Sequence, residues 1–134
     1  MLAGQAQKEA WVNEAFARID GLLHCSVEGE RADPPPSPAN GEAWVIATGA
    51  TGAWAGKDAM IAARQADNWL YIEGKDGMRL YDKSTGQERL FATTWVTPVI
   101  PMEPTGGSVV DVEARAVLAE LILALRVSGV FPRP

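Results

Sequence analysis

Residues 41–95 read GEAWVIATGATGAWAGKDAMIAARQADNWLYIEGKDGMRLYDKSTGQERLFATTW, and this stretch carries the strongest signal of the fold class. It contains four of the five tryptophans of the chain, and short apolar runs in it alternate with turns rich in Gly, Asp and Ser. Turns of that composition at intervals of about ten residues are typical of an antiparallel meander or a small barrel. The stretch therefore predicts a compact β domain over residues 41–96.

Five strands are predicted in this domain, over residues 43–47, 59–64, 68–73, 78–82 and 89–92. Side chains alternate between the faces of a strand, so the third strand places Trp69 and Tyr71 together on one face. Leu70 and Ile72 share the opposite face and are the better core candidates because they are aliphatic. Trp69 and Tyr71 are therefore expected to face solvent, another subunit or a ligand.

The aromatic residues of the β domain allow two interpretations. Exposed Trp and Tyr side chains stack well on sugar rings, which would make Trp54, Trp69 and Tyr71 a glycan-binding site. Small β domains also use tryptophan to fill their own cores. The sequence leaves both interpretations open.

A helix is predicted over residues 5–23, within an N-terminal segment 1–25. Its apolar residues Val12, Phe16, Ile19 and Leu23 are spaced four, three and four apart, so they form one stripe. The stripe either covers the sheet or forms a seam with helices of other subunits, because this spacing is also that of a short coiled coil.

A second helix is predicted over residues 111–127, within a C-terminal segment 108–134. Ser108 followed by Asp111 resembles a capping box at its start. Gly129 followed by Pro132 is a stop signal at its end. The helix would be followed by a short tail.

The apolar residues of the second helix form a band that is too wide for one exposed helix. We expect the band to be covered on two sides, by the sheet and by another helix or subunit. Together the two helices give a predicted oligomer interface, which comprises Val12, Phe16, Ile19, Leu23, Leu118, Leu121 and Leu125.

Two proline-rich segments connect these parts. Residues 31–40 read RADPPPSPAN, and four prolines in five positions favour an extended, polyproline-like connector. Such a run is either a stiff surface linker, which is the simpler interpretation, or a ligand of SH3-type domains. Residues 97–107 form a second loop before the last helix.

Composition limits the class of partner. A chain of 134 residues is long enough for one domain with a modest core. Its formal net charge of −5 argues against nucleic acid or an anionic membrane surface as the main partner. No run of about 18 apolar residues is present, so we expect no membrane insertion.

No motif for chemistry accompanies the β domain. His24 and Cys25 are adjacent, but a catalytic pair needs spatial proximity and a third, orienting group. The acidic residues near the turns (Asp67, Glu73, Asp76 and Asp82) lack the spacing of a calcium loop and are expected to be solvated. The glycine-rich stretch 49–57 lacks the Gly-Lys-Ser/Thr ending of a phosphate loop. We therefore expect no catalytic residue, no metal site, no cofactor and no enzyme activity.

An ordered run of short motifs suggests a family. In chain order the motifs are GQAQKE (4–9), NEA (13–15), ID (19–20), PPPSPANG (34–41), ATGAWAG (50–56), IA (61–62) and Trp69, followed by DVEAR (111–115). This run resembles an uncharacterised domain family of alphaproteobacterial prophages and gene transfer agents, whose members occur in tail fibres and head-spike components. The resemblance covers most of the chain and carries over no catalytic residue.

The resemblance implies a structural protein of a phage-like particle, made in the bacterial cytoplasm and located in the virion. Fibre members usually continue beyond this module, so we expect a spike-base component or a fibre adaptor. Its expected partners are copies of itself in a ring or trimer, and other virion proteins at a capsid vertex, spike or fibre. The alternative is a carbohydrate-binding module for a host surface glycan. The fold expected in either case is α+β, with a small antiparallel β-meander or barrel flanked by an N-terminal and a C-terminal helix.

Overall fold

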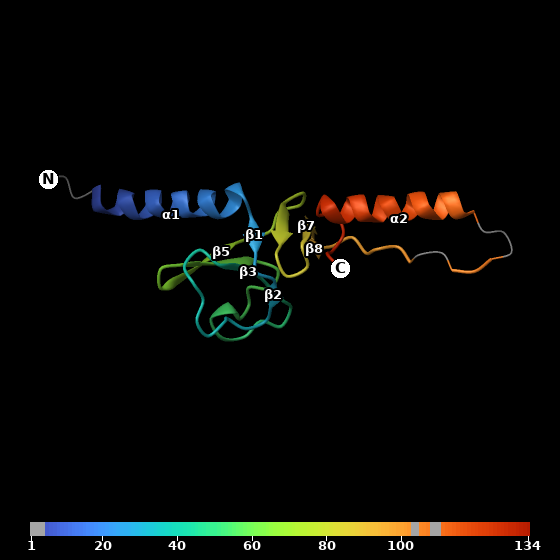
Figure 1. Ribbon diagram of the computed structural model, residues 1–134. Coiled ribbons are helices and arrows are strands. Elements are labelled where there is room, and N and C mark those ends of the chain that lie inside the picture. The colour runs from blue at the N-terminus through green and yellow to red at the C-terminus, as the bar shows by residue number, and fades with distance from the viewer. Residues whose placement is uncertain (1–4, 103–104, 108–110) are drawn as a thin grey trace.

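The computed structural model describes residues 5–102, 105–107 and 111–134 (Figure 1). It confirms the α+β fold class, because two helices flank two four-stranded sheets. The predicted meander or barrel is corrected in one respect: the described strands form two separate open sheets and do not close into a barrel. Antiparallel pairs dominate, with one parallel pair at the edge of each sheet.

The elements follow one another in a simple order. They are α1 (Gln5–Leu23), β1 (Ser26–Val27), β2 (Glu30–Arg31), β3 (Ala43–Ile46), the 3-10 turn η1 (Gly52–Trp54), β4 (Ile61–Gln65), β5 (Asn68–Ile72), β6 (Arg79–Asp82), β7 (Gln87–Ala92), β8 (Thr94–Val96) and α2 (Val112–Val127). One sheet has the strand order β1-β6-β7-β8, and the other has the order β2-β3-β4-β5.

All five predicted strands are present as β3 to β7, with their ends shifted by one or two residues. Three further strands, β1, β2 and β8, have only two or three residues each. An alternation of apolar and polar residues cannot be recognised in strands of two or three residues. In addition, β1 pairs with β6, which lies more than 50 residues away in the sequence. The β domain therefore begins near Ser26 rather than at Gly41.

A short segment between α1 and the proline-rich connector joins the two sheets. On one side, the backbone N–H of Lys83 in the turn after β6 donates to the carbonyl oxygen of Val27 at 2.9 Å. On the other side, Glu28 N–H donates to Ala43 O at 2.8 Å, and Val45 N–H donates to Gly29 O at 3.0 Å. The same few residues thus provide an edge strand to both sheets.

The core has two parts, one on each face of the sheet formed by β2 to β5. The part shared with the other sheet contains Val27, Ala43, Val45, Ile61, Leu70, Ile72 and Leu80. The part on the outer face, called here the tryptophan cluster, contains Trp44, Ile46, Trp54 and Ala62, with Trp69 and Tyr71 packed against it. The predicted alternation in β5 is therefore confirmed.

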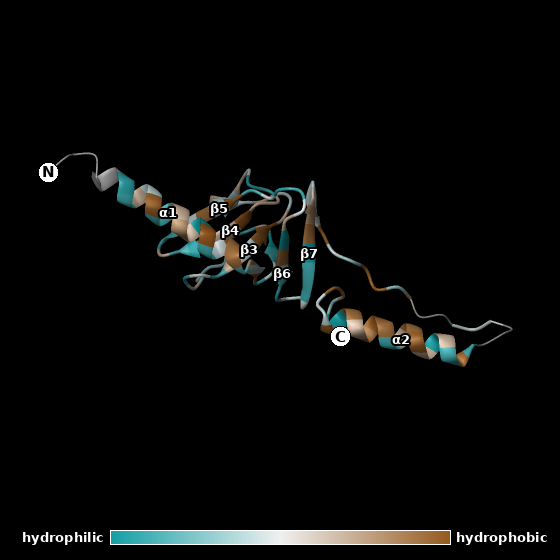
Figure 2. Cartoon of the chain, turned by 90° about the horizontal axis from the view of Figure 1, so that it is seen from above, coloured by the Kyte–Doolittle hydropathy of each residue, from teal (hydrophilic) through white to brown (hydrophobic). Residues whose placement is uncertain are grey.

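Both helices lie on one side of the sheets and extend from opposite ends of the molecule. Figures 1 and 2, which view the chain from directions 90° apart, place α1 and α2 nearly end to end along one line. The N-terminal end of α1 projects beyond the sheets, and α2 lies beyond them at the other end. Among the described residues, no helix is long and apolar enough to cross a membrane.

The expectation that the sheet covers α2 is wrong, since no residue of this helix is buried. Its N-cap is Asp111, whose carboxylate accepts from the backbone N–H of Ala114 at 2.9 Å; the predicted cap Ser108 lies outside the described residues. The chain reverses after α2, and Arg133 N–H then donates to Thr85 O at 2.9 Å. The tail, rather than the helix, therefore binds the sheet.

Candidate functional site

The apolar stripe of α1 faces away from the protein's own core. Val12 is 48% exposed, Phe16 65%, Ile19 57% and Leu23 70%. Two more large apolar residues, Trp11 and Leu22, are exposed beside them. These six residues are called the α1 stripe below.

Small residues explain this orientation, because they occupy the opposite side of α1. Ala17 packs against the core shared by the two sheets. A Cβ added to Gly21 would lie only 3.6 Å from Ile72 Cδ1, so the helix approaches β5 closely at this residue. Arg18 fixes the approach, since its guanidinium donates to Tyr71 O at 3.1 Å and pairs with Glu14 at 2.8 Å. Thus α1 is attached through small and polar residues and presents its large apolar residues outward.

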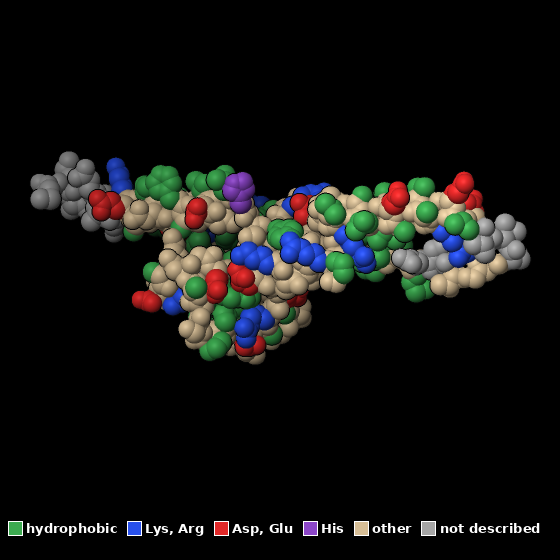
Figure 3. Space-filling view, in the orientation of Figure 1, with side chains coloured by type: hydrophobic (Ala, Val, Ile, Leu, Met, Phe, Trp, Pro, Cys, Tyr) green, Lys and Arg blue, Asp and Glu red, His purple; other side chains and the backbone are tan. Residues whose placement is uncertain are grey.

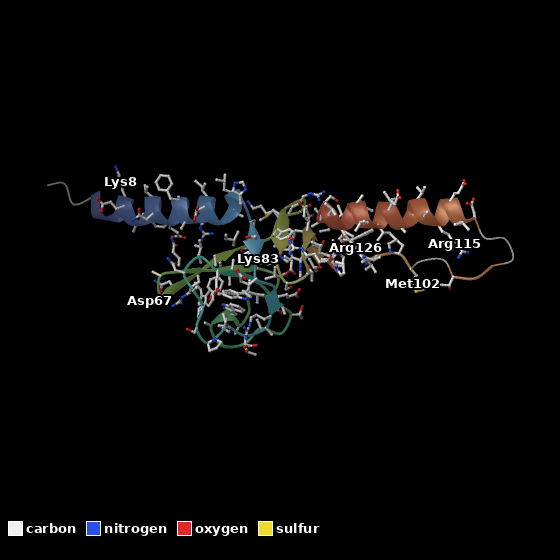
Figure 4. The ribbon with its side chains drawn as sticks, in the orientation of Figure 1. Lys8, Asp67, Lys83, Met102, Arg115 and Arg126 are labelled. Atoms are coloured by element: carbon white, nitrogen blue, oxygen red, sulfur yellow. The ribbon has the colours of Figure 1, made fainter. Side chains whose placement is uncertain are left out.

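The predicted interface residues of α2 are also accessible. Leu118 is 47% exposed and Leu121 53%, while Leu125 is half-buried. A groove of about 220 Å³ runs beside them, between α2 and the extended segment before it. Figure 4 shows that Met102 comes from this segment and that Arg115 points towards it from α2. The guanidinium of Arg115 donates to Gly106 O at 2.6 Å, which ties the segment to the helix.

The space-filling view shows how the helices differ from the rest of the surface (Figure 3). Hydrophobic side chains follow the upper edge of both α1 and α2. Below the helices, Lys, Arg, Asp and Glu side chains are scattered over the β domain in this view. Exposed apolar surface of this extent makes the helices the candidate site of this chain.

The tryptophan cluster is a packed core rather than an open platform. Trp54 has no exposed surface, and its ring centroid lies 6.3 Å from that of Trp44 and 5.1 Å from that of Trp69. These separations and tilted or edge-on geometries are those of packed aromatic pairs. Because its ring is fully covered, Trp54 is not available to stack on a sugar.

Trp69 and Tyr71 are half-buried at the edge of this cluster. The Nζ atom of Lys57 lies 4.3 Å from the ring centroid of Tyr71, and the guanidinium of Arg64 lies 5.4 Å from that of Trp69. The Tyr71 hydroxyl donates to Ala53 O at 2.8 Å, and burial raises the pKa of this hydroxyl. Cationic side chains of the same chain thus already lie against the two partly exposed rings of the predicted glycan site, Trp69 and Tyr71.

Asp82, expected to be solvated, is instead the centre of a buried ion-pair network. Its carboxylate has no exposed surface and accepts from Ser84 Oγ at 2.6 Å and from Arg89 Nε at 2.8 Å. Arg89 also pairs with Glu30, so the network joins β2, β6 and β7. A buried carboxylate needs partners of this kind.

The network shifts the pKa of both of its central groups. Burial alone would raise the pKa of Asp82, but hydrogen bonds from Ser84 and Arg89, and the charge of Arg89, outweigh it and lower the pKa. Burial alone would lower the pKa of Arg89, whereas its bonds to Glu30 and Asp82 raise it. Both groups stay charged, which suits a structural link between the sheets.

His24 and Cys25 are adjacent in the sequence but differ in their surroundings. His24 is exposed at the end of α1, and Cys25 is half-buried against the core. Burial raises the pKa of the Cys25 thiol, which disfavours the reactive thiolate. The described residues also contain no group of three or more His, Cys, Asp or Glu side chains that could hold a metal ion.

A comparison with known families matches residues 12–96 to one described as "Protein of unknown function (DUF2793)". The match covers more than half of the chain. The chain belongs to this family. The DUF2793 region contains most of α1 and both sheets, whereas α2 and the extended segment before it lie outside the match. No curated protein matches the chain.

Proposed function

We propose that this DUF2793 chain is a structural component of a phage-like particle, either a gene transfer agent or a prophage particle. In this role it is a spike-base component or a fibre adaptor that assembles as a homo-oligomer. It is located in the virion, is made in the bacterial cytoplasm, and contacts other virion proteins at a capsid vertex, spike or fibre. It has no catalytic step and needs no cofactor.

The observation that carries this proposal is the outward orientation of the α1 stripe. Each of its six large apolar side chains is more than 40% exposed, although α1 has a sheet beside it that could have covered them. Burial of apolar surface is the main driving force of protein association, so an uncovered stripe of this kind favours contact with a partner. We therefore infer that a partner protein covers the α1 stripe, which the chain itself leaves exposed.

The resemblance to prophage and gene transfer agent proteins supports a location in a phage-like particle. The motifs that carry it lie mainly in α1, in the proline-rich connector and in the loop around η1. Repeated copies are the rule in such particles, and closed symmetry lets one apolar face serve every copy. Apolar helix faces and a small rigid β domain suit a building block of such an assembly.

A carbohydrate-binding module remains the alternative, because Trp69 and Tyr71 lie side by side on β5 and both are partly exposed. Their contacts with Arg64 and Lys57 favour a packing role instead. The assembly role is therefore the better supported of the two.

Mass spectrometry of purified particles tests the proposal. We expect the wild-type chain to be present in several copies per particle and to be oligomeric when isolated. The double variant Phe16→Asp/Ile19→Asp should stay folded but be absent from particles, because unpaired carboxylates on the stripe are costly to bury. The matched control is Ala10→Asp, on the opposite side of α1, and should be incorporated normally. A wild-type chain that is absent from particles and monomeric at high micromolar concentration would overturn the proposal.

A further inference from the structure

We propose that α1 is the core of a parallel bundle of three or more copies of this chain, and that the bundle axis follows the line shared by α1 and α2. The inference rests on the proposed homo-oligomer and specifies its geometry. In this bundle, the α1 stripe of each copy is covered by α1 of the neighbouring copies.

The charge pattern of α1 makes like-with-like contact possible. In a parallel symmetric bundle, each residue meets the same residue of the other copies, so a charge on the contact face would meet its like. The six residues of the stripe, between positions 11 and 23, are all uncharged. Lys8 lies on the same face of α1 one turn before Trp11, so the contact runs from Trp11 to Leu23 and leaves Lys8 beyond its N-terminal end. Glu14 and Arg18 pair with each other, and Arg18 also binds the backbone of β5, away from the stripe.

The width of the stripe favours more than two helices. With about 100° of rotation per residue, the six residues from Trp11 to Leu23 cover an arc of about 140°. A two-helix coiled coil buries a narrower seam, whereas helices of larger bundles bury a wider face. A pair of helices that meet through Val12, Phe16, Ile19 and Leu23 would leave one flank of the stripe, formed by Trp11 and Leu22, in water.

The position of the β domain is compatible with such a bundle. The side of α1 that carries Ala17 and Gly21 faces the sheets, and the stripe lies on the opposite side. A bundle formed through the stripes therefore keeps the β domains on its outside, where they do not obstruct one another.

The position of α2 favours parallel over antiparallel copies. Because α1 and α2 lie along one line, an axis beside α1 also passes beside α2 (Figures 1 and 2). In a parallel bundle, the α2 helices therefore gather around the same axis, where exposed apolar residues outside the groove, such as Val117, can be covered. An antiparallel arrangement would place the α2 helices at opposite ends and leave these residues exposed.

Disulfide cross-linking of full-length chains tests the direction of the helices. The background is Cys25→Ala, which removes the single native thiol. In a parallel bundle, Val12→Cys alone should give disulfide-linked dimers, because equal positions come within the 4.4–6.8 Å between Cα atoms that a disulfide requires. In an antiparallel bundle position 12 lies opposite position 23, about 16 Å along the helix from its own copy, since each residue rises 1.5 Å.

Two further cysteine variants provide the control and the test of the antiparallel arrangement. Ala10→Cys lies at nearly the same height but on the other side of α1, and should not cross-link. Cross-linking that occurs only when Val12→Cys chains are mixed with Leu23→Cys chains would overturn the parallel arrangement. So would equal cross-linking of Ala10→Cys and Val12→Cys.

Light scattering of the reduced protein tests the number of copies. We expect a mass of at least three times the 14.3 kDa of one chain, and a dimer would contradict the inference. The two proposals fail separately. A parallel bundle that is absent from particles removes the virion role, whereas a chain found in particles as a dimer, or without cross-linking of Val12→Cys, removes the bundle.

Discussion

The β domain and the two helices differ in how far their large apolar residues are buried: the β domain buries them, and the helices expose them. In the β domain, Trp54, Ile46 and Ile61 are almost completely buried by other parts of the same chain. In α1 and α2, residues such as Phe16 and Val127 are mostly exposed. The β domain therefore buries its large apolar residues within the single chain, and the helices leave theirs exposed.

Tryptophan shows this difference within one residue type. Trp54 is 0% exposed at the centre of its cluster, whereas Trp11 is 73% exposed on α1. The contribution of a side chain to folding follows the apolar area that it buries. Substitutions in the two regions should therefore separate folding from assembly.

The largest effect on folding is expected for Trp54→Ala. Removing a fully buried Trp from a packed core costs about 3–5 kcal/mol of unfolding free energy, which urea titration followed by circular dichroism would measure. Trp11→Ala is the matched control and should cost the monomer less than about 0.5 kcal/mol. Equal effects of the two substitutions would contradict the division between β domain and helices.

The next largest effect is expected at the ion pair that joins the two sheets. Asp82→Ala leaves Arg89 buried with only Glu30 as its acidic partner, and we expect a loss of about 3 kcal/mol, at the lower end of the range for a broken buried pair. Lys83→Ala removes a nearby exposed pair with Glu28 and should cost less than about 1 kcal/mol. Similar costs for the two variants would show that Asp82 does not link the sheets.

Asp82 also predicts how stability depends on pH. The pKa of Asp82 in the folded protein is lower than that of an unfolded aspartate, about 3.9. Its contribution is therefore fully present at pH values above that of the unfolded group, and is lost as pH falls below about 4 towards the folded pKa. Denaturation curves from pH 6 to pH 2 should show a smaller acid-dependent loss in Asp82→Asn than in the wild type. An unchanged acid dependence would contradict this role.

A smaller effect is expected for Trp69→Ala, since this residue lies at the edge of the tryptophan cluster and is only half-buried. We expect a loss of about 1–3 kcal/mol, below that of Trp54→Ala, with a lower melting temperature. Binding to host surface polysaccharide would be measured on the same samples. Unchanged melting together with lost glycan binding would favour the carbohydrate-binding alternative over assembly.

The smallest effect is expected for the double substitution of His24 and Cys25 by Ala. His24 is exposed and Cys25 is half-buried, so the packing cost should stay below about 1.5 kcal/mol. Incorporation into particles and particle-mediated transfer should be unchanged. Loss of transfer with folding and assembly preserved would reveal a reactive site.

Local patterns predicted much of the fold. The bounds of α1 and the alternation along β5 follow from spacings of a few residues, and both agree with the structure. The sequence did not reveal β1 and β2, because each has only two residues, too few for an alternating pattern to show. Asp82 resembled an ordinary turn residue, because the sequence pattern does not show that Arg89 and Ser84 bind its carboxylate in the folded hairpin.

The spacing of apolar residues along α1 is enough to show which of them form a stripe, because helical periodicity is a local property. That the stripe faces away from the sheet follows from the folded structure alone. Ala17 and Gly21 allow the opposite side of α1 to approach Ile72 closely, which larger side chains would prevent. Whether an apolar residue serves the core or a partner depends on which side of its helix fits the sheet, and that fit exists only once the chain has folded.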